Sequence, residues 1–391
     1  MTFDAQAATA AYINSLGPQA LARAAAYTTG NHWLLFWNLT VTVLVTWGVV
    51  RVGLLERVAA RVSPRRVNLR VFTVCAVYSV ASSLLGAPWT IYTNWWRETA
   101  YGRTSQPFAD FLGQSALALV LSTLIGALFL VALYALIRRT GRYWWAWSGG
   151  LTAIAVAGLM LAAPIFIEPL FNDYKPVPEG PVRAALVPMA AQAGVPTDRI
   201  YVYNGSRQSN NFTANVSGIG RSARVAISDI AFKGASIDEV RAVTGHEIGH
   251  YVLGHVWRGV LVISLLSVAA FYLADRLFPR FARALGSSAA LDDPVGVPIL
   301  LLIVSVLGLA GEPLLNALSR YDETEADRYS LSFVNLPDAL ASSLVKTAEY
   351  RNPRPGALEE ALFYDHPSVE HRVRMAMEWK TAHPPSATAG H

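Results

Sequence analysis

The stretch 244–256 holds residues whose types and spacing can bind and use a metal ion. His246 and His250 are four positions apart, so on an α-helix their imidazoles share one face and can bind a single Zn²⁺ ion. Glu247 lies beside them, where its carboxylate can accept a proton from a water molecule. Short patterns of this kind also arise by chance among ordinary polar helix residues, so the remaining sequence must decide between the two interpretations.

A nearby histidine, His255, does not complete this site by spacing. It follows His246 by nine positions, and a continuous helix that turns by about 100° per residue would point the two side chains in roughly opposite directions. Nor does His255 fit the offsets of the extended metzincin motif. We therefore expect His255 to pack or to form a hydrogen bond, and the third ligand to come from elsewhere.

The acidic stretch 319–327 is the natural source of that ligand. Glu323 and Asp327 are four positions apart, so one carboxylate can bind the metal while the other holds a ligand histidine in the required tautomer. By the same periodicity Asp322 and Glu325 face away. Carboxylates that simply contact solvent beyond an apolar segment are the alternative interpretation.

Local signals predict the helix that carries the two histidines. Ser236 followed by Glu239 has the form of a capping box, in which each side chain hydrogen-bonds the backbone of the other residue. Gly245 and Gly249, beside the ligands, would let a neighbouring strand or a substrate come close.

The polar region 172–255 has the pattern of a small α+β domain. It predicts a helix over 181–194 and a strand over 199–203. Two segments of alternating pattern, 211–217 and 223–228, predict a hairpin.

The rest of the chain has the composition of a membrane protein. Of its 391 residues, 53% are hydrophobic and only 15% are charged, against about 25% charged in soluble proteins. Helices buried in a soluble core seldom stay apolar on every face over the roughly 20 residues that a bilayer requires. Apolar segments near that length recur six times, at 33–50, 71–92, 111–137, 144–167, 256–274 and 295–318. The predicted fold is a multi-pass α-helical membrane protein with an α+β metal-binding domain.

These segments divide the chain into five parts. We predict an N-terminal membrane domain with four transmembrane helices (1–171), the first part of the metal-binding domain (172–255), a transmembrane hairpin (256–318), the second part of the metal-binding domain (319–380) and a disordered tail (381–391). The hairpin leaves from the histidine helix and returns beside Glu323, so both ends lie on one side of the membrane. The metal site is therefore expected at, or just within, the membrane boundary.

The formal net charge of +5 comes mainly from arginines that flank the apolar segments. Anionic lipid headgroups explain these arginines better than nucleic acid does, because the sequence has no aromatic and basic nucleic-acid-binding module. Membrane lipids are thus expected partners, and nucleic acid is not. Cys75 is the only cysteine, which excludes an intramolecular disulfide.

Several segments together resemble the integral-membrane CAAX prenyl endopeptidase family, zinc metalloproteases of the sterile-mutant type. They are residues 84–92, 164–172, 209–211, 246–250, 319–327 and 366–372. The resemblance implies a zincin-type α+β protease domain and a ring of membrane helices around a water-filled chamber, with the zinc site capping one end. It also implies that this chain lacks the first membrane helix of the eukaryotic members.

The resemblance implies that Glu323 joins the two histidines as the third ligand of one Zn²⁺ ion per chain, beside Asp327. The ion would polarise the scissile carbonyl and lower the pKa of a water molecule towards about 7. Glu247 would take the proton from that water and pass it to the leaving amine.

The resemblance also offers His366 as a hydrogen-bond donor to the developing oxyanion, supported by Arg372. Asn210 precedes a predicted edge strand and can hydrogen-bond the backbone of a peptide that adds to the strand. The expected substrate is a peptide or protein, with or without an attached lipid.

Two other functions are compatible with the sequence. A quality-control protease of the heat-shock membrane type would have the same zinc motif. A membrane scaffold or channel with a structural zinc site is the non-enzyme alternative, but Glu247 binds no metal and is needed only for chemistry, which argues against it.

The composition, rich in alanine and arginine, indicates a bacterial protein of the cytoplasmic membrane. The resemblance implies that the zinc site faces the cytosol. The short loops on the other side oppose this orientation under the positive-inside rule. Their arginines are Arg51, Arg57, Arg61, Arg65, Arg66, Arg70, Arg138, Arg139 and Arg142.

Overall fold

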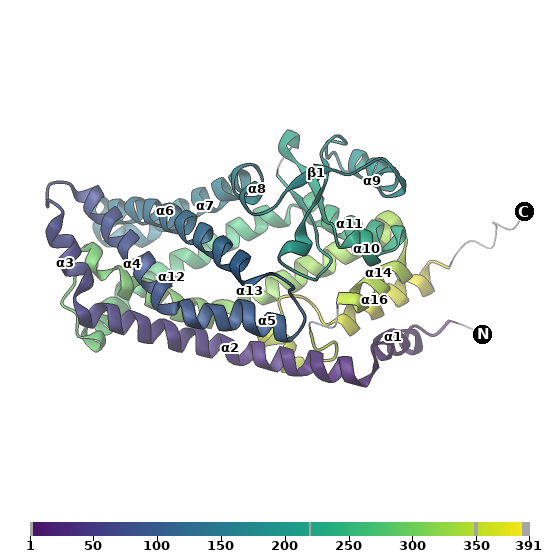
Figure 1. Cartoon of the computed structure of the whole chain (residues 1–391), viewed down its shortest axis with the longest axis horizontal. Coiled ribbons are helices and arrows are strands. Elements are labelled where there is room, and N and C mark those ends of the chain that lie inside the picture. Colours follow the sequence, from purple (N-terminus) through teal and green to yellow (C-terminus); the bar gives the residue numbers. More distant parts are fainter. Residues whose placement is uncertain (1–2, 219, 348–350, 385–391) are drawn as a thin grey trace, which may run out of the picture.

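The computed structural model describes residues 3–218, 220–347 and 351–384. Long helices form an extended bundle, and a small domain of mixed helix and strand sits at one end of it (Figure 1). This arrangement confirms the predicted multi-pass helical protein with an α+β domain.

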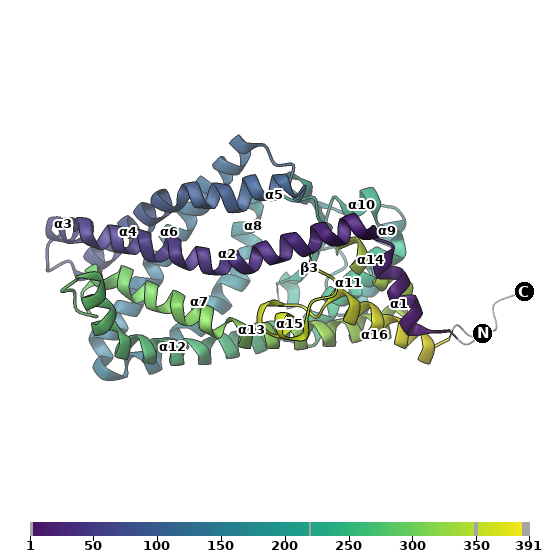
Figure 2. The same cartoon turned by 90° about the horizontal axis from the view of Figure 1, so that it is seen from below.

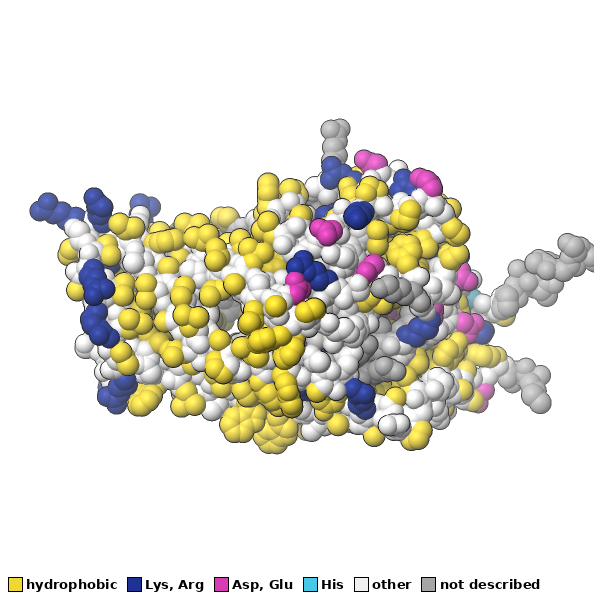
Figure 3. Space-filling view, viewed as in Figure 1, with side chains coloured by type: hydrophobic (Ala, Val, Ile, Leu, Met, Phe, Trp, Pro, Cys, Tyr) yellow, Lys and Arg dark blue, Asp and Glu magenta, His cyan; other side chains and the backbone are white. Residues whose placement is uncertain are grey.

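The predicted apolar segments fall in the long helices of the bundle. These are α2 (Gly17–Val52), α4 (Val67–Ile91), α6 (Phe108–Thr140), α7 (Trp144–Ala162), α12 (His255–Leu285) and α13 (Val297–Val334). Among the described residues, five continuous helical segments are long and apolar enough to cross a membrane, and one of them, Phe108–Phe171, contains both α6 and α7. On the face seen in Figure 3, hydrophobic side chains are spread along the bundle and charged ones gather at its far end and on the small domain, as expected for a surface in contact with lipid.

The bundle has an open cavity as well as a packed core. Helices α4 and α6 pack together, as do α7 and α12, and α2 runs alongside α13 (Figure 2). Between α2, α4 and α6 lies a cavity of about 820 Å³ whose lining includes the polar side chains of Asn38, Thr42, Ser82 and Asn94. This open, partly polar cavity between membrane helices is compatible with the predicted chamber.

The small domain contains a four-stranded sheet in the order β1-β2-β4-β3. The strands are β1 (Tyr174–Pro176), β2 (Ile200–Tyr203), β3 (Ala214–Ser217) and β4 (Arg224–Ser228). β3 and β4 pair antiparallel, which confirms the predicted hairpin, and β2 pairs parallel to β4. β4 is buried throughout, because it lies between β2 and β3 and shares a hydrophobic core with α9 (Pro181–Gln192). In this order β1 and β3 form the two edges of the sheet.

The helix α11 (Ile237–Val252) begins where the capping box predicted. Ser236 Oγ accepts a hydrogen bond from the Glu239 backbone N–H at 3.1 Å, and Glu239 Oε2 accepts one from the Ser236 backbone N–H at 2.7 Å. Glu239 also accepts hydrogen bonds from Ser342 and Lys346 of α14 (Pro337–Thr347). The start of the histidine helix is therefore held in place by tertiary contacts.

Helix α11 packs closely on α13 through its glycines. A Cβ atom at Gly249 would lie 3.1 Å from Ala326 Cα and from Tyr329 Cβ, and one at Gly245 would lie 3.0 Å from Ser330 Oγ. The prediction that these glycines admit a strand or a substrate is wrong, because a helix occupies the space.

The shorter α-helices lie between these elements or at the ends of the chain. They are α1 (Ala5–Asn14), α3 (Leu54–Arg61), α5 (Arg97–Ala100), α8 (Glu168–Phe171), α10 (Ala231–Gly234), α15 (Ala357–Phe363) and α16 (Val369–Ala382). α13 continues without a break across the predicted boundary at residue 318, so one helix joins the membrane part to the small domain. The predicted tail begins with the last two residues of α16, and residues 385–391 lie outside the described part of the chain.

Candidate metal centre

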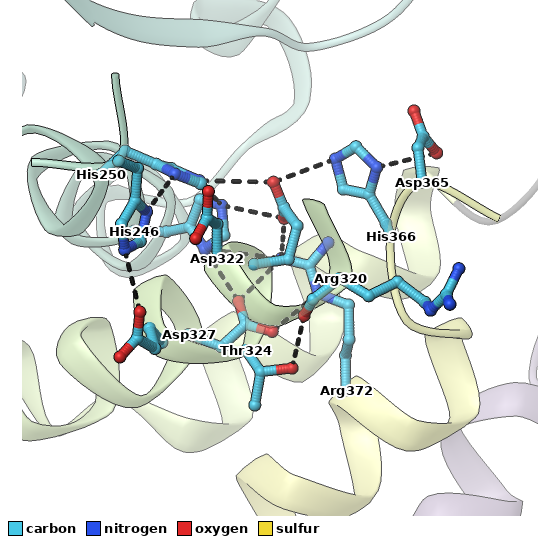
Figure 4. A network of polar contacts seen from close by, with 12 residues as sticks. His246, His250, Arg320, Asp322, Thr324, Asp327, Asp365, His366 and Arg372 are labelled. Atoms are coloured by element: carbon cyan, nitrogen blue, oxygen red, sulfur yellow. Dashed lines mark hydrogen bonds and ion pairs between the residues drawn. The ribbon is translucent and has the colours of Figure 1, made fainter. Parts of the chain in front are cut away.

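Three side chains of metal-ligand type converge between α11 and α13 (Figure 4). His246 Nε2 lies 3.1 Å from His250 Nε2 and 3.3 Å from Glu323 Oε2, and His250 Nε2 lies 3.3 Å from Glu323 Oε1. A tetrahedral ion with bonds of about 2.0–2.1 Å places its ligand atoms about 3.3 Å apart. Glu323 Oε2 is buried and forms no hydrogen bond of good geometry with the described residues. The donor set therefore fits a metal ion.

A buried carboxylate orients the first histidine. His246 Nδ1 lies 2.8 Å from Oδ1 of Asp327, whose side chain is fully buried. A carboxylate at this position accepts the Nδ1 proton, so the lone pair of Nε2 points at the metal position. Burial by itself would lower the pKa of His246, but Asp327 and Glu323 outweigh burial and raise it to about 10. The carboxylates around His246 thus strongly favour a positive charge at this position.

Arg372 compensates the charge of Asp327. Its Nε lies 2.7 Å from Asp327 Oδ2, its Nη2 lies 2.7 Å from Asp327 Oδ1, and Nη2 is 3.4 Å from Glu323 Oε2. In the structure the guanidinium pairs with Asp327. Its expected support of His366 stays a prediction. The spacing of residues within 319–327 cannot reveal an arginine 45 positions away.

Glu247 follows His246 on α11 and stands outside the ligand set. Burial raises the pKa of its carboxyl above the ordinary value, although the two neighbouring histidines act in the opposite direction. A carboxylate with a raised pKa is a better proton acceptor, which suits the predicted role of general base.

His366 reaches the same site from the segment between α15 and α16. Its Nε2 lies 3.2 Å from Glu323 Oε1, and its Nδ1 lies 3.0 Å from Asp365 Oδ1. Burial would raise the pKa of Asp365, but His366 and Arg351 outweigh burial and lower it to about 2. The His366 ring is about one third exposed, at 32%, so it forms part of the open rim of the metal centre.

Arg320 of α13 holds the segment that carries His366, a role that the sequence analysis did not identify. Its guanidinium donates to the backbone carbonyls of Glu360, at 3.0 Å, of Ala361, at 3.2 Å, and of Tyr364. One helix therefore supplies Glu323 and also anchors the histidine opposite it.

Asn210 has partners within its own chain. Its Nδ2 donates to the carbonyl of Gly102 at 2.9 Å and to Ser105 Oγ at 3.1 Å, which ties the sheet to the segment between α5 and α6. Its expected contact with a substrate backbone stays a prediction.

His255 does not follow the geometry of a continuous helix. α11 ends at Val252, Gly254 adopts a left-handed conformation with φ of 70°, and α12 begins at His255. The ring turns back towards the second ligand, and His255 Nδ1 lies 2.8 Å from His250 Nδ1. The expected hydrogen bond is present, but the glycine-induced break places it next to a ligand.

Two family descriptions match the chain. Peptidase family M48 matches residues 176–380, and the CAAX prenyl protease N-terminal region with five membrane helices matches residues 5–173.

Individual relatives agree with these matches. The uncharacterized metalloprotease YhfN of Bacillus subtilis is 31% identical over 72% of this chain and 67% of its own length. The CAAX prenyl protease 1 homolog of Arabidopsis thaliana is 24% identical over 89% of this chain and 85% of its own. The crystal structure of S. mikatae Ste24p has the same fold, with a TM-score of 0.72 and 22% identity over 85% of this chain and 80% of that one.

The geometry predicts which substitutions remove the metal. His246→Ala, His250→Ala and Glu323→Ala should each bind far less than one metal ion per chain, because each removes one of three converging ligand atoms. Metal analysis of the purified protein measures this, with His371→Ala as a matched histidine control that contacts Glu360 instead. Full metal content in Glu323→Ala would show that another residue is the third ligand.

Proposed function

This chain belongs to peptidase family M48, and we propose that His246, His250 and Glu323 bind the zinc ion of this membrane metalloprotease. The separations of 3.1 to 3.3 Å among their ligand atoms carry the proposal. When bound, the zinc ion supplies Lewis-acid polarisation of the scissile carbonyl. Glu247 takes a proton from the attacking water and delivers it to the leaving amine, and His366 donates a hydrogen bond to the oxyanion.

The substrate that we propose is a peptide presented from the bilayer, with a lipid-modified C-terminus. The relatives named as CAAX prenyl proteases suggest a prenyl group. A cavity of about 630 Å³ beside His250 supports an apolar ligand, since its lining includes Met160, Val256 and Trp257. Its position at the start of α12 gives access from the membrane helices.

Cleavage of matched peptides tests this substrate class. The purified protein should hydrolyse a farnesylated CAAX peptide with a higher kcat/KM than the same peptide without the lipid. Equal kcat/KM for the two peptides would show that the lipid is not part of the recognised substrate.

Glu247→Gln should keep its zinc and its melting temperature while kcat falls by about 10²–10⁴ for both peptides, since the glutamine amide cannot accept the proton. Wild-type kcat in Glu247→Gln would show that Glu247 is not the general base.

The oxyanion role of His366 predicts a loss confined to chemistry. His366→Phe should keep zinc and thermal stability while kcat falls by about 10²–10³, the range for loss of one oxyanion donor. His371→Ala, five positions along, serves as the control and should have wild-type kcat. A change in KM alone would assign His366 to substrate binding instead.

We propose that the protein lies in a bacterial cytoplasmic membrane with its metal centre on the cytosolic side, as the resemblance to prenyl endopeptidases implies. The arginines at the far end of the bundle, around α3, favour the opposite orientation (Figure 3). Alkaline phosphatase fused after His391 should therefore be inactive, and a fluorescent protein at the same place should fluoresce. An active phosphatase would reverse the orientation and agree with the arginine distribution.

A further inference from the structure

The second ligand histidine has a histidine as its outer partner. His250 Nδ1 lies 2.8 Å from His255 Nδ1, on the side of the ring away from Glu323. His255 is only 5% exposed, and the left-handed turn at Gly254 aims it at His250. The contact is therefore built into the junction between α11 and α12.

The other nitrogen of His255 faces acidic residues of α13. Its Nε2 lies 3.3 Å from Glu325 Oε2, and ligand-type atoms of His255, Asp322 and Glu325 all lie within 4.8 Å of one another. This contact does not have the geometry of a hydrogen bond, and Nε2 is buried with no hydrogen-bond partner among the described residues.

Arg258 holds this acidic pair from the first turns of α12. Its Nη1 lies 2.7 Å from Glu325 Oε2 and also donates a hydrogen bond to Asp322, which is labelled in Figure 4. The guanidinium already supplies a positive charge between the two carboxylates, so the cluster does not need a second metal ion.

The proton positions along this series follow from hydrogen-bond chemistry. If Nε2 of a neutral His250 binds the metal, its proton is on Nδ1, and Nδ1 donates to His255. His255 Nδ1 must then accept, so a neutral His255 has its proton on Nε2. That nitrogen faces a carboxylate, which stabilises a proton at this position. Each of these contacts favours the tautomer of His250 that has its proton on Nδ1 and leaves Nε2 free to bind the metal.

We propose that His255 is a positioning residue, which together with Glu325 and Arg258 fixes the tautomer and ring orientation of His250 for metal binding. The inference rests on the proposed metal ligands. With this role for His255, each of the two ligand histidines is oriented by a carboxylate paired with an arginine. His246 meets a carboxylate–arginine pair directly, through Asp327 and Arg372, whereas His250 meets one through His255.

Two substitutions of nearly equal shape isolate the hydrogen bond. Leucine at position 255 removes it, whereas asparagine places a carbonyl oxygen near the position of Nδ1. In the full-length protein in detergent, we expect His255→Leu to weaken Zn²⁺ binding by about 10–100-fold and His255→Asn to restore it close to wild type. Competition with a chelating dye measures the dissociation constants, and melting of the metal-free proteins checks that both variants fold equally well.

The outcomes separate this inference from the ligand assignment. Wild-type Zn²⁺ affinity in His255→Leu, or equal weakening in both variants, would overturn the positioning role. Two tightly bound Zn²⁺ ions per wild-type chain would also overturn it, because the acidic cluster would then be a second metal site. If His250→Ala binds Zn²⁺ with wild-type affinity, the assignment of His250 as a metal ligand is wrong. If His250→Ala loses Zn²⁺ but His255→Leu binds it with wild-type affinity, the ligand assignment is retained and His255 has only a structural role.

Discussion

The close contact between α11 and α13 is the constraint on which the metal centre depends. The histidines come from one helix and Glu323 from the other, so the helix separation determines the distances between the ligand atoms. At Gly249 the backbone of α13 is so near that an added Cβ would lie 3.1 Å from Ala326 Cα. A side chain there would push the helices apart, whereas metal sites hold their ligand distances within about 0.2 Å.

Helix α13 also joins the site to the membrane. Its first residues, including Ile299, Leu300 and Ile303, are buried in the core of the bundle, and the same helix continues to Glu323. An α-helix rises by about 1.5 Å per residue, so the length of α13 between this core and Glu323 sets how far the metal centre lies from the core of the bundle. The metal centre is thus tied to the membrane part of the protein by a single helix.

Charge compensation shapes the surroundings of the ligands. Glu323 and Asp327 bring two buried carboxylates into contact with one arginine, Arg372. Buried charges are costly unless they are paired, so this group is best balanced by an additional cation among the ligand atoms. On the other side of His250, Arg258 compensates Asp322 and Glu325 separately.

The sequence by itself determined the features that depend on local geometry. The spacing of His246 and His250, the spacing of Glu323 and Asp327, the capping box and the apolar segments were all readable, because helical periodicity and bilayer thickness act over short stretches of chain. Tertiary structure alone decided which residues meet across long separations. Arg372 pairs with Asp327, α13 fills the space beside the glycines, and His255 returns to His250 after a break in the helix. Such contacts depend on how separate segments pack, and the periodicity of one segment contains no information about its neighbour.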